Sequence, residues 1–124
     1  MRILLIALFA VCCASAARGE EIAPRGKGTI DREYVLYATG LWAATIADVE
    51  TTRHALGKGG VREGNPLFGD DPSRGRMYAI IVPLNLLSMY AAYRGKQSGR
   101  WWWRLPVLIP TGTHGVAAGL NLRF

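Results

Sequence analysis

The chain has 124 residues, of which 50% are hydrophobic and only 19% are charged, and its formal net charge is +6. This length suits a single domain, while the composition argues against both an ordinary soluble domain and a disordered chain. Because the positive charge is spread over the loops and not gathered in one arm, we expect contact with lipid headgroups and no binding of nucleic acid.

The first 17 residues have the layout of a secretory signal peptide. Arg2 precedes an apolar run over 3–13, and a small-residue stretch then leads into polar residues. An apolar core of about 11 residues is short for a membrane-spanning helix, which needs about 20. We therefore expect cleavage after Ala16 or Ala17, with an uncleaved anchor or a lipidated cysteine as alternatives, and then a polar segment over 18–33. Both cysteines lie within the signal, so the mature chain would have no thiol for a disulfide or a metal.

Three apolar stretches follow, over about 34–56, 77–93 and 105–122, and each lacks charged residues over most of a bilayer span. A helix of 17 to 18 residues, the length of the second and third stretches, covers about 26 Å, slightly less than the roughly 30 Å of a hydrocarbon core. The aromatic residues at the ends of the stretches suit the membrane interface. The polar stripe that buried helices of a soluble bundle would show is absent. The sequence therefore predicts an all-α fold, a small transmembrane bundle of three spans over 34–124, located in the bacterial inner membrane.

The first span ends in polar residues, and their spacing separates two faces of the expected helix. Asp48, Thr51 and Thr52 share one face. Glu50 lies on the adjacent face, where it can pair within its own helix with Arg53 or His54. Asp48 is thus left without a local cation, and an acid at membrane depth costs at least ~2.5 kcal/mol unless it faces a partner or water. We therefore expect Asp48 to meet a polar group from another span.

Polar residues in the second and third spans are the expected partners of that acid. Asn85 interrupts the second span, and His114 and Asn121 lie seven residues apart on one face of the third. These side chains and the acid could converge on one intramembrane polar cluster. Gly115 and Gly119 form a small-xxx-small pair, which predicts close helix packing.

The connection between the first two spans contains two turn signals. Asn65 precedes Pro66, which favours a turn because the residue before a proline is pushed out of the helical region. A loop that folds back would bring Glu63 or Asn65 towards the polar cluster, whereas an exposed turn would leave a solvated glutamate. Farther on, Asp71 before Pro72 predicts the N-cap of the second helix.

These motif residues resemble a family of small prokaryotic integral membrane proteins of unknown function. The resemblance covers roughly 34–124 and consists of Asp48, Thr51-Thr52, Glu63-x-Asn65-Pro66-Leu67, His114 and Asn121. It implies a membrane bundle with the motif positions as a shared site, and it implies no activity.

Three functions fit the pattern. The first is a non-catalytic membrane protein whose polar residues hold its helices together or mediate association with a second copy or another membrane protein, without a cofactor. The second is an intramembrane metal or proton site, with Asp48, Glu63 and His114 as ligands or as an acid/base pair. The chain has only two histidines and no H-E-x-x-H spacing, which argues against metal and leans against an enzyme. The third is binding of a lipid headgroup or small molecule in a homo-oligomer.

Overall fold

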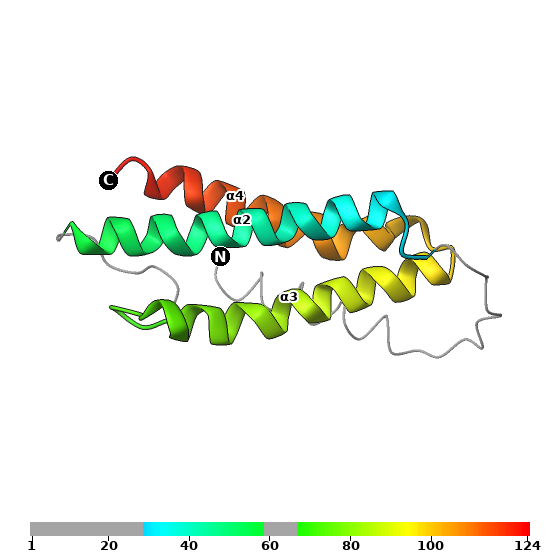
Figure 1. Ribbon diagram of the computed structural model, residues 1–124, viewed down its shortest axis with the longest axis horizontal. Coiled ribbons are helices and arrows are strands. Elements are labelled where there is room, and N and C mark those ends of the chain that lie inside the picture. The colour runs from blue at the N-terminus through cyan, green and yellow to red at the C-terminus, as the bar shows by residue number, and fades with distance from the viewer. Residues whose placement is uncertain (1–28, 59–66) are drawn as a thin grey trace.

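The computed structural model describes residues 29–58 and 67–124, which form three long helices (Figure 1). The elements are α2 (Arg32–Gly57), α3 (Arg74–Gln97), a short 3₁₀ helix η1 (Trp101–Arg104) and α4 (Leu105–Asn121). The described part of the chain contains no strand. α2 and α4 run parallel to each other, and α3 runs antiparallel to both, so the helices form one elongated bundle (Figure 1).

The all-α prediction is confirmed for the described residues, and each apolar stretch forms one helix. Within those residues, however, no helix combines the length and the apolar character that crossing a membrane requires. The second half of α2 carries Asp48, Glu50 and Arg53, and α4 has 17 residues. The expected signal peptide over 1–17 and most of the polar segment over 18–33 lie outside the described residues.

Side chains at the starts of α2 and α3 satisfy free backbone N–H groups. The Asp31 carboxylate accepts a hydrogen bond from the Tyr34 N–H at 2.9 Å, and the Ser73 hydroxyl accepts one from the Arg76 N–H at 3.2 Å. The predicted N-cap at Asp71 is therefore wrong by two residues, because that carboxylate pairs with a cation on α2. The Lys96 ammonium also donates to Asp31, and this bond and the N-cap bond hold the pKa of Asp31 below its ordinary value.

Two apolar clusters fill the interior, one towards each end of the bundle. The first cluster consists of Tyr34, Leu41, Ala92, Trp103 and Val107. The second consists of Val49, Phe68, Met77 and Ile81. Between them the buried polar side chains of Thr45, Asn85 and Ser88 are 0%, 2% and 2% exposed. The middle of the interior is thus polar, whereas its two ends are apolar.

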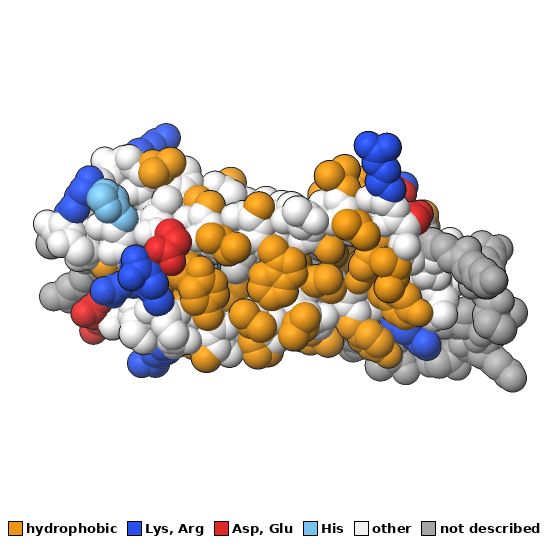
Figure 2. Space-filling model, viewed as in Figure 1, with side chains coloured by type: hydrophobic (Ala, Val, Ile, Leu, Met, Phe, Trp, Pro, Cys, Tyr) orange, Lys and Arg blue, Asp and Glu red, His pale blue; other side chains and the backbone are white. Residues whose placement is uncertain are grey.

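The outer surface has the reverse pattern. The chain has no charged residue over 35–47, 77–93 or 105–122. Large apolar side chains in these ranges are exposed, for example Leu36 at 68%, Leu86 at 53% and Val116 at 65%. On the face that Figure 2 shows, hydrophobic side chains cover the middle of the bundle, and charged side chains gather towards its two ends. We call this charge-free surface the apolar belt.

Candidate polar site between α2 and α4

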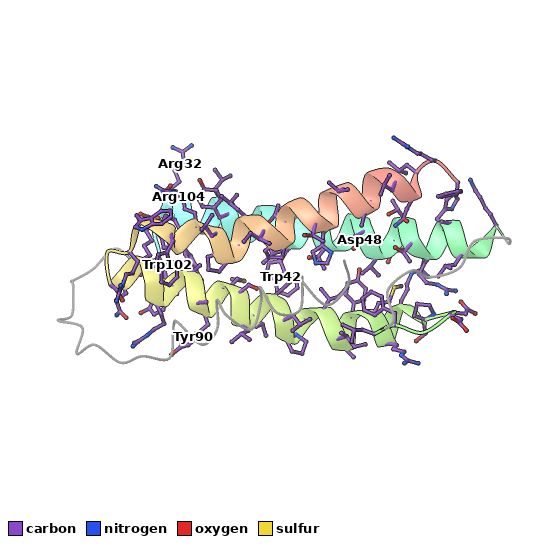
Figure 3. The ribbon with its side chains drawn as sticks, turned by 180° about the vertical axis from the view of Figure 1, so that it is seen from behind. Arg32, Trp42, Asp48, Tyr90, Trp102 and Arg104 are labelled. Carbon is purple, nitrogen blue, oxygen red and sulfur yellow. The ribbon has the colours of Figure 1, made fainter. Side chains whose placement is uncertain are left out.

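The central contact of the site joins α2 to α4 through an acid and an imidazole. Asp48 Oδ2 lies 2.7 Å from His114 Nδ1, and the two side chains are 14% and 15% exposed. Figure 3 labels Asp48 where α2 lies against α4. Asp48 thus faces another helix, which agrees with the prediction. It does so because positions 45, 48 and 52 recur at helical spacing along the inner side of α2.

Asn121, seven residues after the histidine, supplies the second link between these helices. Its amide donates to the Thr52 hydroxyl at 2.7 Å. Longer contacts join the same amide to Thr51 Oγ1 at 3.4 Å and to Asp48 Oδ1 at 3.5 Å, and Thr52 donates to Asp48 Oδ1 at 3.4 Å. Since both α4 side chains reach one face of α2, the contacts form a single network of five residues. We call it the Asp48 network.

Asn85 belongs to a separate contact. Its amide donates to Thr45 Oγ1 at 2.8 Å, and Thr45 in turn donates to the Leu41 carbonyl at 2.8 Å. Among the described residues, no hydrogen bond connects Asn85 to the Asp48 network. The polar residues therefore form two clusters, whereas a single cluster was expected. The reason is that Thr45 lies one turn before Asp48, on a slightly rotated face that meets α3. Sequence reasoning missed Thr45, although its three-residue spacing from Asp48 was a usable signal.

The ion pairs at this end differ from the expected ones. Glu50 was expected to pair within its own helix, but its carboxylate lies 2.9 Å from the Arg74 guanidinium on α3. Arg53 instead binds the Asp71 carboxylate at 2.8 Å and the Pro72 carbonyl at 2.9 Å. Residues near in space but distant in the chain compete successfully with those on the same helix. The inference that Asp48 has no cation on its own helix agrees with these pairings.

The remaining predicted positions fall into two groups. Glu63, Asn65 and Pro66 lie outside the described residues. Gly115 and Gly119 are exposed, and among the described residues no atom outside the adjacent backbone of α4 lies within 4 Å of a Cβ built at either position. Their predicted helix packing is therefore not found inside the described part of the chain, because the glycine face of α4 is turned away from α2 and α3.

The chemistry open to the site follows from its donor set. Among residues 29–58 and 67–124, no three His, Cys, Asp or Glu side chains are grouped to hold a metal ion. Of the expected ligand set, Asp48 and His114 meet, and Glu63 is not described. An acid that accepts a hydrogen bond from the Nδ1–H of histidine orients the ring and leaves Nε2 as the basic nitrogen. The arrangement can therefore crosslink two helices and hold a proton.

Comparison of the chain with protein-family models, with curated proteins and with solved structures gave no match. The resemblance to a small membrane-protein family stays a prediction based on the motif residues.

Proposed function

We propose that this chain is a small integral membrane protein of the bacterial inner membrane, whose helices lie in the bilayer as one bundle and whose function is structural, in assembly with a membrane partner. The observation that carries the proposal is the apolar belt. In water, a helical bundle buries apolar side chains and exposes polar ones. Here the middle of each helix is charge-free outside, while Thr45, Asn85 and Ser88 are buried inside.

This arrangement also accounts for the modest apolar character of each helix taken alone. Three of the polar residues that lower it, Thr45, Asn85 and Ser88, are buried against neighbouring helices and do not contact lipid. At 1.5 Å per residue, the 26 residues of α2 extend over about 39 Å and the 24 residues of α3 over about 36 Å. The 17 residues of α4 extend over about 26 Å, and the four residues of η1 lengthen it by about 8 Å. These lengths suit a hydrocarbon core of about 30 Å.

Within that bundle the Asp48 network fastens α4 to α2. Side-chain hydrogen bonds between helices contribute up to about 1.7 kcal/mol in a bilayer, and here two short ones occur within two turns of α4. The open face at Gly112, Gly115 and Gly119 leaves room for the backbone of another helix. A second copy of the chain or another membrane protein is the partner that we propose for this face.

A pair of leucine-to-arginine substitutions tests membrane embedding. Leu86 lies in the apolar belt and is 53% exposed, and Leu122 follows the end of α4 and is 72% exposed. In a bilayer, arginine costs about 2.5–3.5 kcal/mol at the centre of a span and far less at its end. We expect Leu86→Arg to lose retention in the membrane pellet after alkaline carbonate extraction, and Leu122→Arg to retain it. Equal behaviour of the two variants, or release of the wild type, refutes the proposal.

A second candidate is proton handling by Asp48 and His114, favoured by their 2.7 Å contact. Intramembrane acids paired with histidine mark proton pathways in transport proteins. Proton flux into vesicles that contain the purified protein, compared with Asp48→Asn, separates the candidates. Flux that depends on Asp48 supports proton handling. A variant that loses only oligomer size or stability supports the structural function.

A further inference from the structure

The two carboxylate oxygens of Asp48 have different surroundings. Oδ2 lies 2.7 Å from His114 Nδ1, which is a short contact. Oδ1 meets the Thr52 hydroxyl at 3.4 Å and the Asn121 amide at 3.5 Å, and both distances exceed the roughly 2.5–3.2 Å of good hydrogen bonds. The side chain is only 14% exposed. Asp48 therefore brings a charged oxygen into the bundle that has no short hydrogen bond among the described residues.

The charge on this oxygen has no counter-charge from the described arginines and lysines. Arg53 and Arg74 bind more exposed acids, at 2.8 and 2.9 Å. The imidazole of His114 reaches the other oxygen of Asp48 and adds no charge in its neutral form. A largely buried carboxylate is stable as an anion only with a partner cation or with hydrogen bonds that replace water. A bound cation at Oδ1 meets this requirement.

Three neutral polar groups lie around Oδ1 at the spacing of ligands around a metal cation. The Asn121 amide nitrogen lies 2.7 Å from Thr52 Oγ1 and 3.4 Å from Thr51 Oγ1. Oxygen ligands lie about 2.3–2.6 Å from Ca²⁺, so two ligands at right angles are about 3.3–3.7 Å apart. Na⁺ has nearly the same radius as Ca²⁺. Three of the four separations among these groups, at 3.4, 3.4 and 3.5 Å, fall in this range.

The donor atoms favour a monovalent ion. The Thr51 hydroxyl donates its proton to the Ala47 carbonyl at 2.7 Å, so its oxygen lone pairs remain available. A half-turn of the Asn121 amide puts the carbonyl oxygen where the NH₂ group lies, which replaces a donor by a ligand. One carboxylate with three neutral oxygens balances a single positive charge. A divalent ion at the same place would keep an uncompensated buried charge.

We propose that the Asp48 network binds one Na⁺ ion between α2 and α4. The ligands are Asp48 Oδ1, Thr51 Oγ1, Thr52 Oγ1 and the side-chain oxygen of Asn121. Because three of them belong to α2 and the fourth to α4, the ion joins the two helices. K⁺ is larger and needs wider separations between its ligands. The inference goes beyond the proposed structural function and does not require the bilayer, since the packing of the helices shields these groups from solvent.

Equilibrium binding of radioactive sodium to the purified full chain in mild detergent tests the site. The buffer is held at about pH 8, where free imidazole is neutral. We expect saturable binding of one ion per chain, which unlabelled NaCl displaces and which KCl or choline chloride displaces at least about tenfold less well. Sodium at about five times its Kd should also raise the midpoint of thermal unfolding by about 4–8 °C over choline at equal ionic strength.

Two pairs of variants test the ligands. Asp48→Asn keeps the shape of the side chain without its charge and should abolish sodium binding, whereas Glu50→Gln removes an acid of the same helix outside the network and should retain it. The second pair decides if Asp48→Asn fails to fold. Thr51→Val and Thr113→Val each remove a hydroxyl that donates to the carbonyl four residues earlier, at 2.7 and 3.0 Å. Of the two, Thr51 contacts Asn121, so its variant should bind sodium at least about tenfold more weakly, and Thr113→Val should bind it normally.

Several results would overturn the sodium site. The first is the absence of saturable sodium binding to the wild-type protein while its helical content is intact. The second is displacement by K⁺ as effective as displacement by Na⁺. The third is undiminished binding in Asp48→Asn, or equal binding by the two threonine variants. Each of these results leaves the proposed membrane location untouched, because alkaline extraction of the leucine-to-arginine variants measures that location separately.

Discussion

Breaking the contact between Asp48 and His114 should weaken the attachment of α4 to α2 by a measurable coupling energy. A hydrogen bond to a charged group contributes about 1.5–3 kcal/mol in folded proteins, whereas side-chain bonds between helices in a bilayer average about 0.6 and reach about 1.7 kcal/mol. The 2.7 Å distance and the 14% and 15% exposure of the two side chains favour the upper part of the bilayer range. We therefore expect a coupling of about 1.5 kcal/mol.

A double-mutant cycle measures this coupling. The variants Asp48→Ala and His114→Ala and their combination are unfolded in mild detergent by a denaturing detergent, with helical content as the readout. The matched control is a cycle on Glu50 and Arg74, an acid on the same helix and its cation on α3. These side chains are 43% and 62% exposed, and their 2.9 Å ion pair should contribute about 0.5 kcal/mol or less.

The comparison of the two coupling energies tests whether burial and a short distance strengthen the contact between Asp48 and His114. A coupling for Asp48 and His114 that is no larger than that of the exposed control pair would refute the reasoning, because burial and short distance would then add nothing. Salt provides an independent check. It should weaken the exposed pair more than the network, since a pair shielded from solvent is screened less.

Three further results are expected. Gly95→Ala should destabilise the bundle by about 1–3 kcal/mol, because the new methyl group presses on η1, whereas Gly40→Ala, with open space around it, should stabilise α2 by about 0.5–1 kcal/mol; thermal unfolding of both variants compares them. Thr45→Val should cost about 1–2 kcal/mol by stranding the Asn85 amide, and combining it with Asn85→Leu should cost less than the sum of the single changes in the same unfolding assay. Because its lysine partner holds the pKa of Asp31 below its ordinary value, the stability from this contact is present above the unfolded pKa of about 3.9 and is lost as pH falls through the folded pKa; carboxyl NMR should show this pKa rising when the lysine becomes glutamine.

The positions of the helices could be predicted from the sequence, because each long apolar run without charged residues favours a helix. α4 begins at 105 as expected, and α2 begins within two residues of the predicted start at 34. The polar face of α2 was readable from the spacing of its polar residues. Helical spacing puts Asp48 and Thr52 on one side, and the seven-residue spacing of His114 and Asn121 puts both on one side of α4.

Contacts between helices were not readable in the same way. Spacing places residues on a face of their own helix, but the rotation of each helix decides which neighbour that face meets. Asn85 could therefore have joined either polar group, and its contact with Thr45 follows from where α3 lies against α2. The same holds for Glu50, which binds Arg74 on α3 and not a cation of its own helix.

The sequence by itself determined the three helices, their charge-free middles and the inward position of Asp48, since these depend on residue type and spacing along one chain. The tertiary structure decided that the polar interior divides into an α2–α4 network and an α2–α3 contact. It also decided that Gly115 and Gly119 face outward. These features depend on helix rotation, which is set by the combined packing of residues such as Tyr34, Leu41 and Trp103 and by no single local signal.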